Sequence, residues 1–318
     1  MVGQLRLPMY CQYWINIEEM AYIRRIDRQL LNWLSGQEQR EIAAVHSIFD
    51  KVVNLLTKDE NRLISFALEA VVQAPDMMKT NEAQVFTMFR DSIQVGEIAQ
   101  LESDSTIRIG TTFWSYEGAV LWDGTIPRIR SIHLENLAGQ IATFLHRHAE
   151  KRDSGLLSAW LAYSGHAQQA GDADLVYTKV FLEGLCCFDE AIRSGQTQDM
   201  LHASGRLLGL GLGLTPSGDD FLLGCLALWQ VFDMRLFSPY KECDWLKQIK
   251  GKTTTHSYFM LKQCIDGFVN NAFIELFQVI GKGGDMGKAL DEFLRIGSTS
   301  GIDMLIGALF AMQYTKKG

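Results

Sequence analysis

The sequence lacks the features that mark several common classes of protein. It holds only five prolines among 318 residues, and no low-complexity tract. The six cysteines form no C-x-x-C pair, and Cys225 lies within an apolar run, so we expect reduced thiols rather than a disulfide framework. None of the seven histidines belongs to an H-E-x-x-H motif, and His146 and His148 would diverge on a helix. These absences exclude a disulfide-stapled scaffold and a zincin-type metal site.

Positive charge and long apolar runs are also missing. The formal net charge is -7, which offers no basic surface for nucleic acid. No apolar run reaches the roughly 18 residues that a membrane span needs. The first residues, MVGQLRLPMYCQYW, lack a basic region followed by an apolar stretch, so we expect no signal peptide. We therefore expect a cytoplasmic protein that binds neither nucleic acid nor membrane.

The chain is long enough for two domains after an N-terminal extension. Hydrophobic residues make up 47% and charged residues 21%, as in ordinary globular proteins. A possible capping box at Asn16 and Glu19 and an apolar stripe after it predict a helix over Asn16 to Leu34. We therefore expect residues 1–40 to form a helical extension that docks on the body of the protein or on a partner.

Residues 41–132 read as a mostly-β domain. The apolar spacing of Val45 to Thr57 fits a helix, but its β-branched residues and the turn-like Lys58 to Asn61 favour a hairpin. Further strands are predicted at Ile93 to Leu101, Thr106 to Thr111 and Gly118 to Trp122.

Residues 133–318 read as a larger all-α domain. Helical patterns cover Leu134 to Ala149, Leu156 to Ala170, Asp174 to Arg193, Gln198 to Leu208, Trp245 to Ile249, Thr255 to Phe268, Ala272 to Ile280 and Met286 to Leu294. The predicted fold class is thus α+β, a small mostly-β domain followed by a larger helical one.

The most informative stretch is Leu207 to Phe232, in which a glycine-alternating run and a short polar loop precede an apolar helix. Ser217 and Asp220 have the spacing of a capping box. The pattern S-G-x-D-x-L-x-G recurs from Ser300 to Gly307, again at the start of an apolar run. The repeat predicts two equivalent helices, each beginning at a polar loop.

Both repeats place a glycine inside the helix. Gly224 and Gly307 each cost about 1 kcal/mol relative to alanine, which close helix–helix contact would offset. We therefore expect the two helices to pack with their N-termini around one pocket, where free amides and the helix dipoles favour an anion. The alternative is that Asp220 and Asp303 serve only as helix caps. Asp219 is not needed for capping, which makes it the stronger functional candidate.

A second polar cluster begins at Lys252. Gly251-Lys252-Thr253 resembles the end of a P-loop, but Leu246 stands where the first glycine is required, which excludes a Walker site. The glycines at 209, 211 and 213 do not form G-x-G-x-x-G, which argues against a Rossmann site. The cluster could bind an anion or could only cap a helix.

Asp219 and Asp220 could hold Mg²⁺, but adjacent aspartates diverge at a helix start, and we predict no cofactor and no metal.

The predicted catalytic residues are Asp219 and Asp220. The predicted anion-binding residues are Gly213, Thr215, Ser217, Gly218, Lys252, Thr253, Thr254, Ser257, Ser298, Thr299, Ser300 and Asp303.

Three blocks of the chain resemble one bacterial family. They are the run from Gly211 to Asp220 with Leu222 and Gly224, then Thr253-Thr254 with Ser257, Leu261 and Gly267, then Gly297 to Gly301 with Asp303, Leu305 and Gly307. This pattern is similar to the family that includes the oxamate carbamoyltransferase subunit AllH of allantoin catabolism. The resemblance spans roughly Leu207 to the C-terminus, and the β region resembles the family more loosely.

The resemblance implies a transferase subunit that acts with partner subunits. It would move a carbamoyl group between oxalurate and phosphate, giving oxamate and carbamoyl phosphate, and all of these substrates are small anions. The resemblance carries no catalytic residues with it. Two alternatives stay open: a non-catalytic scaffold subunit, and a small-anion-binding protein without catalysis.

Overall fold

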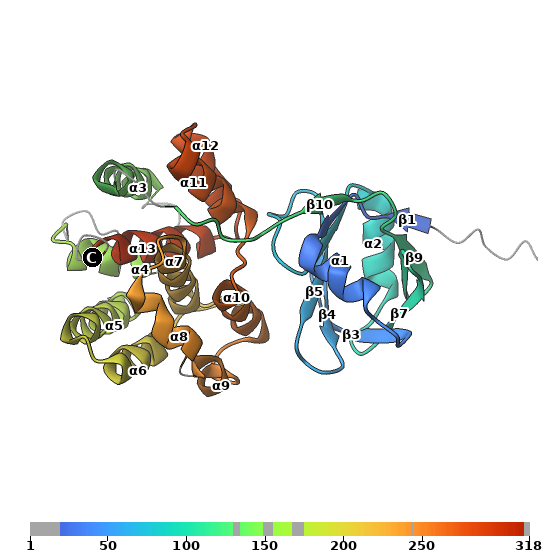
Figure 1. Ribbon diagram of the computed structural model, residues 1–318, viewed down its shortest axis with the longest axis horizontal. Coiled ribbons are helices and arrows are strands. Elements are labelled where there is room, and N and C mark those ends of the chain that lie inside the picture. Colours follow the sequence, from blue (N-terminus) through green and yellow to red (C-terminus); the bar gives the residue numbers. More distant parts are fainter. Residues whose placement is uncertain (1–19, 130–133, 149–154, 167–174, 243, 315–318) are drawn as a thin grey trace, which may run out of the picture. The chain divides into compact units, whose positions relative to one another are not determined.

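The computed structural model describes residues 20–129, 134–148, 155–166, 175–242 and 244–314 (Figure 1). These residues form two compact units. The sheet unit comprises residues 20–70 and 76–123, and the helical unit comprises residues 71–75 and 124–314. A mostly-β N-terminal region followed by a helical C-terminal region confirms the predicted α+β class.

The sheet unit is built on one curled, half-barrel sheet. Its strands are β1 (Met20–Tyr22), β2 (Arg25–Asp27), β3 (Glu41–Ile48), β4 (Val52–Thr57), β5 (Leu63–Leu68), β6 (Met77–Thr80), β7 (Ile98–Ser103), β8 (Thr106–Ile109), β9 (Thr112–Ser115) and β10 (Val120–Trp122). The order across the sheet is β1-β9-β8-β7-β3-β4-β5-β6-β2-β10. β1 and β2 are joined through only Ile23 and Arg24 yet stand near opposite ends of this order, so the sheet must curl back on itself.

Two helices complete this unit, α1 (Arg28–Ser35) and α2 (Ala83–Ser92). Phe86 and Phe89 of α2 are buried with Phe66 of β5 and Trp114 of β9. The ring centroids of Phe89 and Trp114 are 5.1 Å apart in an edge-to-face arrangement, the geometry that aromatic quadrupoles favour. The sheet unit thus has a hydrophobic core of its own.

The helix predicted over Asn16 to Leu34 is wrong for residues 20–27, where the described part of that range begins. Met20–Tyr22 and Arg25–Asp27 form β1 and β2, and only Arg28–Ser35 is helical. Ala21 and Ile23 are buried and Tyr22 is exposed, a strand alternation that the helical stripe concealed. The true cap is Asp27, whose carboxylate accepts from the amide of Leu30. Asn16 and Glu19, the predicted capping box, lie outside the described residues.

The hairpin interpretation of Val45 to Thr57 is confirmed. β3 and β4 pair in antiparallel fashion, and β4 continues through the turn at Lys58 into β5. The predicted strands in the second half of the region correspond to β7, β8 and β10, with β9 in addition.

The helical unit confirms the predicted run of helices. They are α3 (Leu134–His148), α4 (Leu156–Tyr163), α5 (Leu175–Ser194), α6 (Thr197–Leu207), α7 (Ser217–Val231), α8 (Ser238–Glu242), α9 (Trp245–Ile249), α10 (Thr255–Ile265), α11 (Asn271–Lys282), α12 (Met286–Phe293) and α13 (Ser300–Met312), with a short 3-10 turn at Arg235–Phe237. The helix predicted over Leu156 to Ala170 ends at Tyr163, and its residues 167–170 lie outside the described residues.

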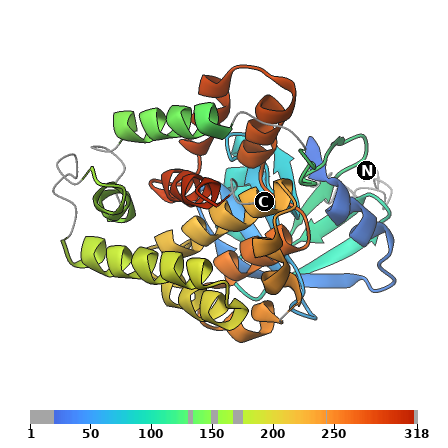
Figure 2. The same cartoon turned by 60° about the vertical axis from the view of Figure 1, so that its left-hand side comes forward.

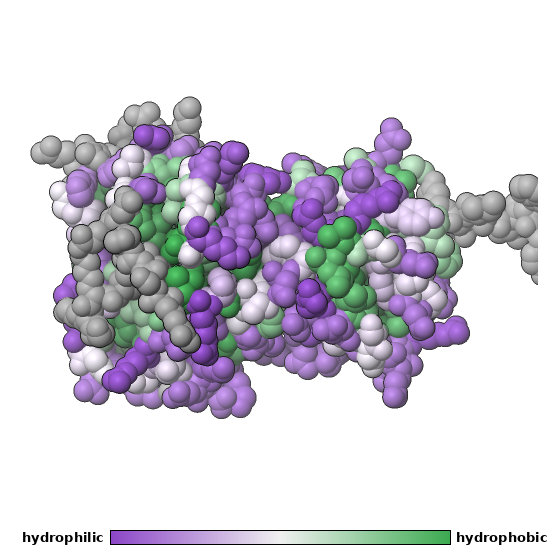
Figure 3. Space-filling model, turned by 45° about the horizontal axis from the view of Figure 1, so that its top comes forward, coloured by the Kyte–Doolittle hydropathy of each residue, from purple (hydrophilic) through white to green (hydrophobic). Residues whose placement is uncertain are grey.

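Helices α7 and α13 form the centre of the helical unit, and the other helices surround them (Figures 1 and 2). Nearly every residue of both helices is buried. None of the described helices has the length and apolarity required to cross a membrane. On the face shown in Figure 3, polar side chains cover most of the surface and apolar residues are confined to patches. The burial of α7 and α13 fixes the position of the loops that precede them.

Candidate functional site

The central feature of the site is the crossing of α7 and α13, where two backbones touch. A Cβ atom added at Gly224 would lie 2.0 Å from the carbonyl oxygen of Met304. One added at Gly307 would lie 2.0 Å from the carbonyl oxygen of Phe221. No real side chain fits at such distances, so glycine is required at both positions. The predicted contact between the two glycine-containing helices is therefore confirmed.

The repeat extends beyond these helices to the ends of the helices before them. A Cβ at Gly218 would meet the carbonyl oxygen of Leu207, the last residue of α6, at 1.9 Å. A Cβ at Gly301 would meet that of Phe293, the last residue of α12, at 1.8 Å. Two equivalent helix–loop–helix elements therefore pack face to face.

The capping boxes predicted at Ser217 and Ser300 are wrong. Each serine is the first helical residue, the caps are Pro216 and Thr299, and neither helix has a side-chain capping bond. Proline ahead of the helix fixes the entry of the chain without a hydroxyl cap. Asp220 and its counterpart Asp303 lie in the first turns of their helices. Neither carboxyl oxygen of Asp220 has a hydrogen-bond partner among the described residues, so the interpretation of Asp220 as a cap is also wrong. For Asp303 that interpretation stays a prediction.

Three loops converge at the start of α7. The hydroxyl groups of Thr215 and Ser300 are 2.9 Å apart, which joins the loops before α7 and α13. The hydroxyl of Thr254 donates to the carbonyl oxygen of Leu214 at 2.6 Å and also caps α10 by accepting from the amide of Ser257 at 3.1 Å. The structure thus brings together residues that are distant in the sequence.

Asp219 holds two of these loops in place. It is fully buried, and one carboxylate oxygen accepts from the amide of Gly209 at 2.8 Å. The other oxygen accepts a very short bond from the hydroxyl of Thr253. Burial raises the pKa of Asp219, while the bonds from Thr253 and Gly209 and the nearby Ser257 hydroxyl oppose that rise. Asp219 therefore fixes the positions of the Gly209 amide and the Thr253 hydroxyl.

Asp220 is buried in a different environment. Neither of its carboxyl oxygens has a partner at hydrogen-bond distance among the described residues. Burial raises its pKa well above the usual value, and the charge of the equally buried Asp303 adds to the rise, although the hydroxyls of Ser300 and Thr215 oppose it. The half-exposed hydroxyls lie between Asp220 and solvent, so a ligand would meet them first.

The loop before α7 offers backbone donors. Gly209, Gly211 and Gly213 have φ angles of +71°, +119° and +99°, which other residues rarely adopt. Within the described part of the chain, no acceptor is recorded for the amides of residues 211–215 and 298–300. Free amides beside a helix N-terminus favour an anion.

Not every predicted residue joins the hydrogen-bonded network. Ser217 and Gly218 are buried in the packing of α7, and Ser257 is buried behind Asp219. Lys252 and Ser298 are exposed, and Gly213 is exposed at the loop tip. Among the described residues, Lys252 forms no ion pair with an acidic group. The ammonium group of Lys252 is therefore available to a bound anion.

The donors at this site suit an anion better than a cation. Hydroxyl and amide groups outnumber free carboxylate oxygens, because Asp219 uses both of its oxygens within the protein. The described residues contain no cluster of three or more histidine, cysteine or acidic side chains able to hold a metal ion.

Two partners in the network were not predicted from the sequence, the amide of Gly209 and the carbonyl oxygen of Leu214. Backbone groups carry no sequence signal of their own. The alternation of glycines before Thr215 was the available signal, since repeated glycine indicates a backbone that turns sharply and exposes its amides.

Two protein-family models match the chain. One, described as oxamate carbamoyltransferase subunit AllH, matches residues 207–312, and the other, described as the AllH family N-terminal domain, matches residues 21–120. The first match runs from the last residue of α6 to the last residue of α13, so it contains both repeats and the three converging loops. Together the two matches cover well over half of the chain. The chain matches no solved structure.

Proposed function

The chain belongs to the AllH family, and from this membership and the geometry of the site we propose that it is a carbamoyltransferase subunit that binds small anions between its two repeats. The family's name designates a subunit of an enzyme, which supports partner proteins for this chain as well. The substrates would be carbamoyl phosphate, phosphate and oxamate or oxalurate, as in allantoin catabolism.

The observation that carries the proposal is the contact between Thr215 and Ser300 beside unoccupied backbone amides. Each substrate carries a phosphate or carboxylate group whose oxygens accept hydrogen bonds. Hydroxyls and amides that point to one place can replace the water around such a group. Lys252, Thr253, Thr254 and Thr299 would add donors at the edge of the site.

The reaction requires charge stabilisation and one proton transfer. A phosphate oxygen attacks the carbamoyl carbon of oxalurate, the bond from that carbon to nitrogen breaks, and the oxamate nitrogen gains the proton that phosphate loses. Negative charge develops on the carbamoyl oxygen during the attack, and backbone amides are suited to stabilise it. Asp219 would orient the Thr253 hydroxyl, and Asp220 would act through the hydroxyls of Thr215 and Ser300.

Loss of one hydroxyl tests the binding site. Thr215→Val keeps the shape of the side chain and removes its donor, and a hydrogen bond to a charged group contributes about 1.5–3 kcal/mol. We expect carbamoyl phosphate to bind the variant at least tenfold more weakly in isothermal titration calorimetry. Thr143→Val, on the exposed face of α3, is the matched control and should bind as the wild type does. Equal affinity in all three proteins would refute the anion site.

A substitution of Asp219 tests the catalytic role proposed for this residue. Asp219→Asn keeps the size of the side chain but cannot accept from both Gly209 and Thr253, so the loops should lose their alignment. In the complex reconstituted with its partner subunits, we expect turnover to fall at least 100-fold while the circular dichroism spectrum is unchanged. Undiminished turnover would favour the alternative of a scaffold subunit whose loops take no part in the chemistry.

A further inference from the structure

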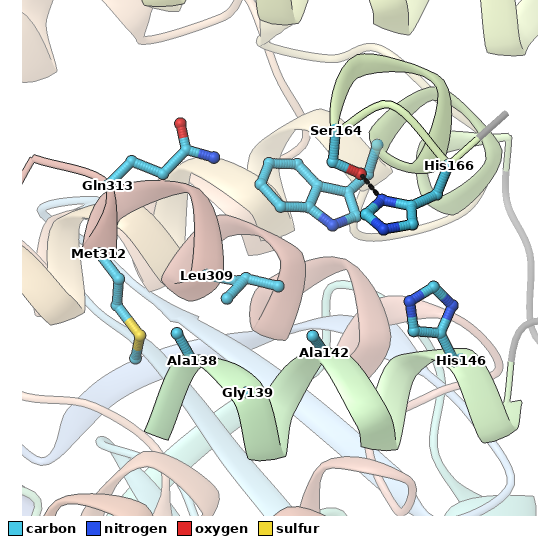
Figure 4. A pocket seen from close by; sticks show the side chains of 10 residues that line it. Ala138, Gly139, Ala142, His146, Ser164, His166, Leu309, Met312 and Gln313 are labelled. Carbon is cyan, nitrogen blue, oxygen red and sulfur yellow. Dashed lines mark hydrogen bonds between the residues drawn. The ribbon is translucent and has the colours of Figure 1, made fainter. Parts of the chain in front are cut away.

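A cavity of about 390 Å³ lies between α3, α4 and α13, at the opposite end of α13 from the anion site (Figure 4). Its lining includes Leu309, Met312 and Gln313, whereas the anion site uses Ser300 at the first turn. Because α13 has 13 residues and a helix rises 1.5 Å per residue, roughly 15 Å or more separates the two places. The cavity has the volume of a small-molecule pocket and is a separate feature of the helical unit.

Small residues of α3 leave this space open. Ala138, Gly139 and Ala142 line the cavity from one side. A Cβ at Gly139 would have no atom within 4 Å, in contrast to Gly224 and Gly307, where the neighbouring backbone leaves no room. Glycine inside a helix costs about 1 kcal/mol relative to alanine. At Gly139, which lines the cavity, no packing contact offsets that cost.

One end of the cavity is polar. Figure 4 shows His146 of α3 directed toward the ring of His166, which follows α4. The ring centroids are 5.7 Å apart, and the Ser164 hydroxyl lies 3.2 Å from Nδ1 of His166. Neither imidazole has an acidic partner at ion-pair distance among the described residues. Both rings are exposed, so they stand at the mouth of the cavity.

Apart from Gln313, the rest of the wall is apolar. Trp160, Leu309 and Met312 line it, and each is at least nine-tenths buried. Trp160 is held by contacts with Tyr163 and Phe310, at centroid distances of 5.6 Å and 6.3 Å. An indole surface and two aliphatic side chains suit a flat apolar group.

We propose that this cavity binds a small organic acid with an apolar, flat body, whose carboxylate lies between His146 and His166 and whose body lies along Trp160. Two imidazoles can donate to carboxylate oxygens, and among the described residues no acidic group forms an ion pair with either ring. The proposal does not depend on the function proposed for the anion site.

Phenylacetate is a suitable probe, with acetate and benzyl alcohol as comparisons that keep only the carboxylate or only the ring. In isothermal titration calorimetry with the full chain, we expect phenylacetate to bind at least tenfold more tightly than either comparison. His166→Gln should weaken its binding several-fold. Equal binding of phenylacetate and benzyl alcohol would overturn the carboxylate assignment.

A variant that fills the cavity distinguishes a ligand-binding site from a void that binds nothing. Gly139→Leu places a side chain in open space and should preserve or raise the melting temperature while abolishing phenylacetate binding. Gly205→Leu is the matched control, because Gly205 is an exposed helical glycine of α6 with equally open surroundings. It should leave binding unchanged. Retained binding in Gly139→Leu, or binding of Zn²⁺ but not of phenylacetate to the wild type, would refute the proposal.

Discussion

At the scale of single residues, the buried carboxyl groups of this chain differ in what surrounds them. Asp219 accepts from an amide and a hydroxyl, whereas Asp220 has no partner at hydrogen-bond distance among the described residues. Asp27 of the sheet unit accepts from the amides of Leu30 and Asp76 at 3.3 Å and 3.0 Å. All three have raised pKa values because burial disfavours the charged form.

The raised pKa of Asp27 predicts that the stability of the sheet unit depends on pH. Burial raises its pKa from 3.8 to about 6, so the folded chain binds this proton more tightly than the unfolded chain does. The corresponding stability is fully present below pH 3.8 and is lost as the pH rises through 6. Urea unfolding between pH 4 and 7 should show Asp27→Asn losing less stability across this range than the wild type. Identical slopes in the two proteins would contradict this assignment.

The raised pKa of the buried Asp220 predicts a dependence of the same sign in the helical unit. Its pKa lies well above 3.8, so the stability from its protonated form persists until the pH approaches that raised value. The binding of one proton changes the free energy of unfolding by up to about 1.4 kcal/mol per pH unit, and Asp220→Asn should remove this slope. Unfolding monitored from pH 4.5 to 7.5 checks this, and Asp291→Asn, an exposed position on α12, should leave the slope unchanged.

At the scale of elements, the crossing of α7 and α13 determines where the loops lie. Gly224→Ala would push its Cβ into the carbonyl oxygen of Met304, and the helices would have to separate. We expect a loss of at least about 3 kcal/mol in the free energy of unfolding, together with weaker anion binding. Gly205→Ala on α6, where nothing lies within 4 Å, should instead be neutral or stabilising by up to about 1 kcal/mol. Guanidinium unfolding distinguishes these outcomes, and equal stabilities would contradict the close crossing.

The sequence was sufficient to predict this crossing and insufficient for the details around it. The repeated glycines indicated close contact because an uncompensated glycine is costly in a helix. The serine–aspartate spacing wrongly indicated capping boxes, since Ser217 and Ser300 are the first residues of their helices and the caps are Pro216 and Thr299. Likewise, Ile23 and Ile26 fitted a helical stripe, although Ile26 lies in β2 and Ile23 in the short connection between β1 and β2. Local spacing cannot reveal partners that only tertiary structure supplies.

At the scale of the whole molecule, the chain contains two units with separate cores. Phe89→Ala should cost about 3–5 kcal/mol in the sheet unit, because the ring packs against Phe66, Phe86 and Trp114. At temperatures where the variant stays folded, it should bind phosphate in the helical unit with the affinity of the wild type. Calorimetric scanning and titration measure the two effects, and a parallel loss of affinity would show that the anion site depends on the sheet unit.

The α+β class and the order of its helices were predictable from the sequence because amphipathic spacing is strong over long segments. The convergence of Thr215, Thr254 and Ser300 was predictable only in part. The repeat indicated that two of these loops meet, while the position of Thr254 depends on how α10 packs against α7.

The most direct test of the anion site is a crystal structure of the full chain grown with phosphate and, separately, with oxamate. The account predicts an anion at hydrogen-bond distance from the hydroxyls of Thr215 and Ser300 and from amides of residues 211–215. An anion bound only elsewhere, or none between the two loops at concentrations that saturate binding in solution, would contradict it.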